Sequence, residues 1–274
     1  MDLFTRLDRA TGWAAASPAP DEPNRPDEPS RPDEPSRPGG PNRQGGPEEP
    51  GRPEERVGPE EPVGPEEPAG LDGLVVGILA EIASGTRPLR AVAHPLGFYC
   101  LPVLREGECG VCVHVFGPVA QDPRRSANPP EIHCHSWELK SRVLYGRVGN
   151  LKARVLDQPR RPTHRAFEVH SRAGTDEIRP TSRLVRWEPV GEQRSARGET
   201  YTLAAGEFHA TLLAGAAPAA TVVLGRSVPG SVDVVLGPVD GPARRVVRRL
   251  CDAAQTARIA GEAARRISGP DQAA

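Results

Sequence analysis

The segment Ile132-His133-Cys134-His135-Ser136-Trp137 alternates as a β-strand does and carries two histidines two positions apart. Alternate side chains of a strand share a face, so His133 and His135 point the same way and Cys134 points to the other side. Two imidazoles on the inner face of a barrel are the beginning of a metal site. The rest of the chain has to supply a third ligand and the barrel.

The third ligand that the sequence offers is His209, which follows a turn at Gly206 and begins another predicted strand. The turn delivers this imidazole into the same barrel. Three nitrogens on one side of an ion leave open positions opposite them for a substrate. We therefore expect His133, His135 and His209 to bind one metal ion.

Short β-branched or apolar runs alternate with Gly, Pro and Asp between residues 97 and 236. The predicted strands are Gly97–Leu104, Gly110–Phe116, Ile132–Trp137, Arg142–Val148, Ala153–Leu156, Ala166–Val169, Arg183–Trp187, Glu199–Leu203, Phe208–Leu213, Ala220–Gly225 and Val232–Leu236. Short strands at this close spacing indicate an all-β antiparallel barrel or jelly roll.

Two helices are expected to flank the barrel. The first spans Gly73–Ser84 with Asp72 as its N-cap, because its apolar residues fall on one face before Gly85 ends it. The second spans Ala243–Ile267, with an apolar stripe and its arginines outside that stripe. Residues 71–268 would form one domain with a substantial core.

Residues 1–70 are expected to be a disordered leader rich in Pro, Glu and Arg, apart from a short helix within Met1–Ala16. Sixteen of the 32 prolines lie between Pro18 and Pro68, a stretch in which only Val57 and Val63 are strongly apolar. Such a stretch buries too little surface to offset the entropy of ordering. Its hexapeptide repeats favour extended polyproline II, either as a solvated spacer or as a docking site for a protein partner.

Charge and hydropathy limit the other partners. The proline-rich stretch holds 14 acidic residues and 6 arginines, so the net charge of −1 leaves about +7 on the remaining residues. That is well short of a basic nucleic-acid-binding stripe. No apolar run reaches the roughly 18 residues of a membrane span, and the first 20 residues lack a signal-peptide pattern. We expect a cytoplasmic protein with reduced thiols and a small-molecule substrate, and a homodimer remains open.

With these motifs the chain resembles the cupin superfamily, whose double-stranded β-helix is a jelly-roll barrel. His133-Cys134-His135 is followed at the family's interval by Gly146, as in the first cupin motif. Gly198, Gly206 and His209 fit the second motif, with Ala204 in its Pro position and Leu213 in its Asn position. The resemblance implies a metal site but no single reaction, since cupins include dioxygenases, isomerases, epimerases and non-catalytic binding proteins.

The family's acidic ligand would fall at Leu139 or Lys140, neither of which binds a metal. Glu138 is one residue early, and alternation turns it away unless a bulge intervenes. Three histidines without an acid resemble the thiol dioxygenase branch of the cupins, which implies Fe(II), with Mn, Ni or Zn as alternatives, and an anionic substrate with O2. The Cys–Tyr cross-link of some thiol dioxygenases is missing, because Lys140 stands in the Cys position and no Tyr follows His209.

Residues beside the ligands are candidates for catalytic roles. Tyr145 shares the parity of the histidines, and Tyr201 precedes His209, so either phenol could hydrogen-bond a metal-bound oxygen. Glu138, Glu207 or Tyr201 would have to be the base of an isomerase or epimerase. An anionic substrate also calls for an arginine, for which Arg105, Arg142, Arg147 and Arg154 are candidates by proximity in sequence.

The remaining histidines and cysteines are expected to be mostly structural. His94, His164 and His170 have no partner at ligand spacing, whereas His114 lies on a neighbouring strand from which it could reach the pocket. Cys109 and Cys112 form a Cys-x-x-Cys, but residues three apart in a strand lie on opposite faces, which argues against a redox or zinc motif. Cys100 and Cys251 are predicted to be small core residues.

Overall fold

The computed structural model describes Thr5 and residues 69–117, 131–157, 160–172, 174–213 and 217–269. The expected helix in Met1–Ala16, apart from Thr5, and the predicted disordered leader lie outside these residues, except that the first helix already begins at Ala69. None of the helices described is long and apolar enough to cross a membrane.

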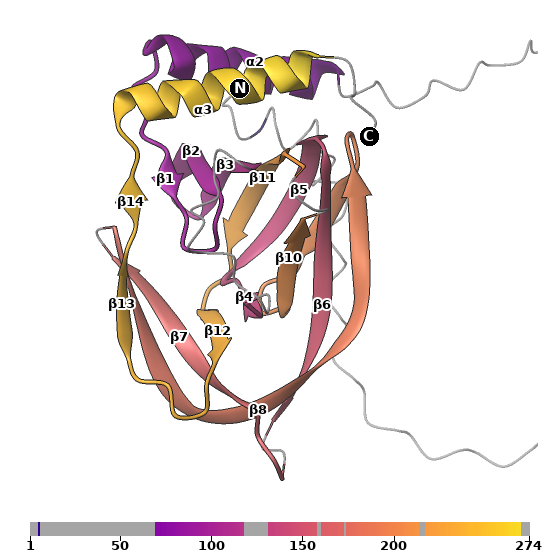
Figure 1. Ribbon diagram of the computed structural model, residues 1–274, viewed down its shortest axis with the longest axis vertical. Coiled ribbons are helices and arrows are strands. Elements are labelled where there is room, and N and C mark those ends of the chain that lie inside the picture. The colour runs from indigo at the N-terminus through magenta and orange to yellow at the C-terminus, as the bar shows by residue number, and fades with distance from the viewer. Residues whose placement is uncertain are drawn as a thin grey trace, which may run out of the picture. The chain divides into compact units, whose positions relative to one another are not determined.

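Two antiparallel seven-stranded sheets form most of the fold (Figure 1). The first, sheet A, has the order β14-β1-β2-β3-β11-β5-β9, and the second, sheet B, has the order β13-β8-β6-β10-β4-β12-β7 with an additional β8–β7 pairing. The strands of sheet A are β1 (Val92–Ala93), β2 (Tyr99–Glu106), β3 (Cys109–Phe116), β5 (Trp137–Tyr145), β9 (Thr200–Leu203), β11 (Ala219–Ser227) and β14 (Arg249–Leu250). Those of sheet B are β4 (His133–Cys134), β6 (Arg147–Asp157), β7 (His164–Arg172), β8 (Thr175–Ala196), β10 (His209–Leu213), β12 (Asp233–Gly237) and β13 (Arg244–Val247). The predicted all-β class with flanking helices is confirmed.

Helices α2 (Ala69–Ser84) and α3 (Ala253–Ser268) lie side by side against the outer face of sheet A (Figure 1). Leu79 and Ile259 from the helices share a fully buried core with Leu101, Val113 and other residues of β2, β3 and β11. Because strand side chains alternate, the neighbours of those two strand residues point to the other face of sheet A. Cys100, Cys112 and His114 are among the residues on that inner face.

A second core fills the space between the sheets. Phe116, Val143 and Tyr201 of sheet A pack there against Val148 of sheet B, with Leu213 half-buried beside them. The far face of sheet B buries its own cluster, which includes Cys134 and Ala210. Cys134 and His133 therefore lie on opposite faces of β4, as alternation predicts.

Several sequence-based boundaries were wrong. The predicted strand Arg142–Val148 is two strands, because Gly146 adopts a left-handed φ of 72° and turns the chain between β5 and β6. The predicted strand Ile132–Trp137 is also divided, since β4 ends at Cys134 and β5 begins at Trp137 in the other sheet. Asp72 is not an N-cap: it lies in the first turn of α2, 3.5 Å from the guanidinium of Arg142.

The predicted helix Ala243–Ile267 starts only at Ala253. Its first part forms β13 and β14 instead, where Val246 pairs with Asp176 of β8 and Leu250 pairs with Val92 of β1. Asp252 then caps α3 by accepting a hydrogen bond from the backbone N–H of Gln255 at 2.6 Å. The β-branched pair Val246–Val247 favours the strand, and edge pairing overrides the helical spacing of the apolar residues.

Candidate metal centre

The structure brings His133, His135 and His209 together. One ring nitrogen of each lies within 4.8 Å of the ring nitrogens of the other two. The ring centroids are 4.9 Å apart for His133 and His135, 4.5 Å for His133 and His209, and 5.1 Å for His135 and His209. His133 and His209 are 8% and 1% exposed, whereas His135 is half-buried.

Backbone pairing fixes all three positions. His209 is directly opposite His133 in the β10–β4 pair, which places both side chains on the same face of sheet B. His135 lies where the chain crosses from sheet B to sheet A, and its carbonyl accepts a hydrogen bond from the N–H of Gly206 at 2.9 Å. The next residue, Ser136, donates its N–H to the carboxylate of Asp233 at 2.6 Å. The turn at Gly206, which precedes His209, therefore also fixes the backbone of His135.

Hydrogen bonds select the protonation of two of the rings. Nδ1 of His133 lies 2.9 Å from the carbonyl of Glu131, and Nδ1 of His209 lies 3.0 Å from the carbonyl of Glu207. A carbonyl oxygen only accepts, so Nδ1 carries the proton in each ring and donates it. The neutral tautomer then leaves the lone pair of Nε2 free, which is the arrangement that metal-binding histidines use.

Burial favours the neutral form of each ring. Burial lowers the pKa of His133, although the carbonyl and carboxylate of Glu131 partly offset the effect. Burial, with the nearby His133 and His209, lowers the pKa of His135 well below 6.5. Burial and His133 lower the pKa of His209 to about 4. Near neutral pH all three imidazoles are therefore uncharged, as metal ligands must be.

This donor set fits a divalent ion of borderline softness. Three neutral imidazoles with no carboxylate among them suit Fe, Zn, Ni or Cu and leave the ion with its full charge. Glu138 does not belong to the cluster of ligand atoms in the part of the chain that the structure describes. Trp137 and Leu139 point inward, Trp137 toward Gly110 and Leu139 into the inner core, so alternation turns Glu138 outward.

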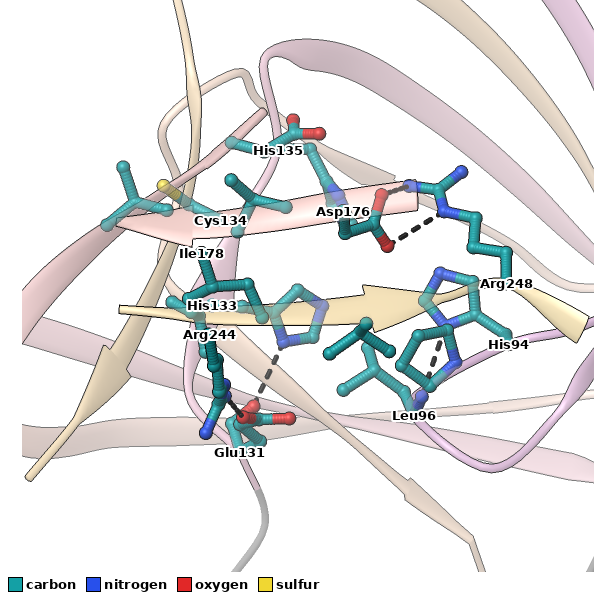
Figure 2. Close-up of a pocket in the computed structure, with 16 residues that line it drawn as sticks. His94, Leu96, Glu131, His133, Cys134, His135, Asp176, Ile178, Arg244 and Arg248 are labelled. Carbon is teal, nitrogen blue, oxygen red and sulfur yellow. Dashed lines mark hydrogen bonds and ion pairs between the residues drawn. The ribbon is translucent and has the colours of Figure 1, made fainter. Parts of the chain in front are cut away.

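A cavity of about 240 Å³ opens on His133 and His135 (Figure 2). Its charged lining comprises Glu131, Asp176, Asp233, Arg244 and Arg248, and its apolar lining includes Leu96, Val169, Ile178, Val235 and Val246. Arg244 pairs with Glu131 at 3.0 Å, and Arg248 pairs with Asp176 at 2.8 Å. Both arginines come from the segment that the sequence suggested was helical, so sequence reasoning missed them. The β-branched pair Val246–Val247 between them is the signal for a strand that could have found them.

Tyr145 does not face the histidines. A β-bulge in the β5–β11 pair, between Ala220 and Thr221, interrupts the alternation. As a result Leu144 and Tyr145 both join the core under the helices, where the guanidinium of Arg266 lies 5.9 Å from the Tyr145 ring. The parity argument for a catalytic Tyr145 was wrong for this reason.

Tyr201 and Glu207 do not line the cavity. Tyr201 is in the inner core, where burial raises the pKa of its phenol. Burial would also raise the pKa of Glu207, but its ion pair with Lys152 at 2.7 Å and a hydrogen bond from the Ala204 N–H hold that pKa below its usual value. Glu207 is consequently an ion-paired carboxylate that binds protons weakly.

The other candidates are spread over the surface and the interior. Arg142 reaches Asp72 of α2 and the carbonyl of Gly198, and Arg154 pairs with Glu188 on the surface. Arg105 and Arg147 are exposed and do not line the cavity. His164 contacts Thr163, and His170 pairs with Glu168.

Two histidines outside the predicted ligand set lie near it. His94, which the sequence suggested was structural, lines the cavity beside His133 and His135. Both His94 and His114 are close enough to lower the pKa of His135. His114 lies on the inner face of β3 but does not line the cavity, so the expectation that it could reach the pocket is not met.

Comparisons with known proteins do not assign a function to this chain. No protein-family model matches the chain, and no curated protein matches it. Among the solved structures that match is a cupin superfamily sugar phosphate isomerase from Silicibacter pomeroyi DSS-3, with 14% sequence identity and a TM-score of 0.29. That match covers 56% of this chain and 78% of the other.

Proposed function

We propose that this protein is a metal-dependent oxygenase that binds Fe(II) through His133, His135 and His209 and acts with O2 on a small anionic substrate. The observation that carries the proposal is the cluster of three uncharged imidazoles, two buried and one half-buried, with no carboxylate among them. A bound Fe(II) would supply a Lewis acid for the anionic atom of the substrate and a redox-active centre through which electrons of the substrate reach O2.

The cavity supports a small anionic substrate. Its volume of about 240 Å³ is below the range typical of drug-sized ligands. Three carboxylates and two guanidinium groups line it, so a divalent ion held by neutral ligands makes the local charge positive. Arg244 and Arg248 are the residues placed to hold an anionic group, since each could exchange its carboxylate partner for the substrate.

A thiol is the substrate that the sequence resemblance implies. Both atoms of O2 then end in the sulfinate product, so the reaction needs no other reductant. Leu96, Val169 and Val246 line the cavity and would exclude water from the carbon chain of such a substrate. An isomerase is less well supported, because Glu138 faces away and Glu207 is ion-paired.

Oxygen uptake tests the proposal. Protein loaded with Fe(II) is expected to consume O2 when given small thiol carboxylates, with His209→Ala lowering kcat/KM at least about 100-fold. His170→Gln, which changes an exposed histidine, serves as the control and should leave the rate unchanged. A panel of 1,3-dicarbonyls tests the second class of anionic chelators. Metal binding without O2 uptake on either panel would overturn the oxygenase proposal in favour of a non-catalytic or isomerase protein.

A further inference from the structure

A second cluster of metal-ligating side chains lies on the inner face of sheet A. Three ligand atoms lie within 4.8 Å of one another: the sulfur of Cys100, the sulfur of Cys112 and one ring nitrogen of His114. Cys100 on β2 pairs directly with His114 on β3, and Cys112 precedes His114 by two residues. Two neighbouring strands therefore aim three donors at one point.

Alternation explains why Cys109 takes no part. Val111, Val113 and Val115 face the helices and lie in their core, so the residues between them face inward. Cys112 and His114 are among these inward residues, whereas Cys109 has the parity of the valines. The Cys-x-x-Cys spacing is thus not the functional unit, and the partner of Cys112 comes from the adjacent strand.

We propose that Cys100, Cys112 and His114 form a second metal site that binds a thiophilic ion, Zn²⁺, separately from the three-histidine cluster. Two sulfurs and one imidazole are the donors that select Zn²⁺ over hard cations, and three protein ligands leave a fourth tetrahedral position open. Zn–S bonds of about 2.3 Å place tetrahedral sulfurs about 3.8 Å apart, so a contraction of at most about 1 Å from the observed separations of up to 4.8 Å is needed.

The surroundings support a bound ion. Thr221 lies directly opposite His114 in the β11–β3 pair and is fully buried. Its hydroxyl has no hydrogen-bond partner among the residues that the structure describes. A buried hydroxyl without a partner is costly, and a thiolate or a metal-bound water beside it would satisfy it.

The two clusters are neighbours but use different residues. The ring of Phe98 stacks on His94 of the cavity with a centroid separation of 4.3 Å and lies 4.6 Å from the ring of His114. The Phe98 ring therefore lies between His114 and the cavity residue His94. The stoichiometry expected for the full chain is two metal ions.

Cobalt substitution tests this site without relying on activity. Wild-type protein, stripped of metal and kept in a non-thiol reductant, is titrated with Co²⁺ and followed by absorption. Thiolate-to-cobalt charge transfer is expected, and Zn²⁺ should displace it. His209→Ala should keep the charge-transfer band, because the three-histidine cluster contains no sulfur.

Matched cysteine variants assign the ligands. Cys112→Ser and Cys100→Ser are expected to abolish the band and to lower Zn²⁺ affinity at least about 100-fold, whereas Cys109→Ser on the other face of the same strand keeps both. Circular dichroism confirms that each variant is folded. Absence of the band in the wild-type protein, its persistence in Cys112→Ser, or a Cys100–Cys112 disulfide that survives the reductant would overturn the proposal.

Discussion

His209 lies directly opposite His133 across the β10–β4 pair, with the two ring centroids 4.5 Å apart. The two residues are 76 positions apart in the chain, and the same local hydrogen bond orients each ring. The Nδ1–H of each ring bonds to the carbonyl two residues earlier. A strand pair of this kind orients two Nε2 lone pairs toward one point before any ion binds.

Removal of one imidazole should therefore abolish metal binding more strongly than any change on the outer face of β4. We expect His135→Ala and His209→Ala each to leave largely metal-free protein, while Cys134→Ser keeps its metal because Cys134 lies in the core behind the sheet. Metal content after dialysis is the measurement. Equal loss in all three variants would contradict the strand geometry.

Glu138 separates three-histidine coordination from three-histidine-plus-glutamate coordination. Because its carboxylate lies outside the ligand cluster, Glu138→Gln should retain metal at the wild-type level and change turnover modestly. Occupancy after dialysis against a weak chelator decides the question. Loss as large as that of His209→Ala would show that the glutamate reaches the ion.

The sequence predicted the clustering of the three histidines better than their surroundings, for a physical reason. Strand parity is a local property, and it placed His133, Cys134 and His135 correctly. It failed at Tyr145, since the bulge depends on how β5 pairs with β11, which no local pattern records. The cavity arginines were missed in the same way: the apolar residues of this segment have helical spacing, but residues 244–247 pair with the long strand β8.

The inner cysteine cluster illustrates the same limit. A spacing rule compares residues within one segment, so it tested Cys112 only against Cys109 and argued against a redox or zinc motif. The structure instead joins Cys112 to Cys100 through the β2–β3 register. Only His114 carried a usable signal, because its strand was expected to lie beside the pocket.

Acid should destabilise the metal-free protein through the histidine cluster. The pKa of His209 is about 4 in the fold, against 6.5 for an ordinary histidine. Below pH 6.5 the unfolded chain binds protons that the fold excludes, so this contribution to stability is complete above pH 6.5. It is then lost as the pH falls toward 4, by an amount on the order of a few kcal/mol.

Urea midpoints measured between pH 7 and pH 4 in the presence of a chelator test this expectation. His209→Gln should flatten the decline, because the excluded proton site is gone. His170→Gln should follow the wild-type curve, since His170 is exposed beside Glu168. Parallel curves for the wild type and His209→Gln would show that His209 does not set the acid limit.

Two glycines with left-handed backbone offer a matched test of how the turns hold the site. Gly146 has φ 72° and Gly206 has φ 77°, so alanine is strained at either position, by roughly 1–2 kcal/mol. A Cβ at Gly146 would also collide with the backbone oxygen of Pro218 and would lie 2.9 Å from the Cα of Ala219, whereas a Cβ at Gly206 meets nothing within 4 Å.

Gly146→Ala is therefore expected to lower the free energy of unfolding by more than about 3 kcal/mol, and Gly206→Ala by about 1 kcal/mol. Chemical denaturation of both variants measures the difference, and equal losses would mean that the chain opens freely at Pro218. Gly206→Ala should in addition weaken metal binding, because the Gly206 N–H holds the carbonyl of His135.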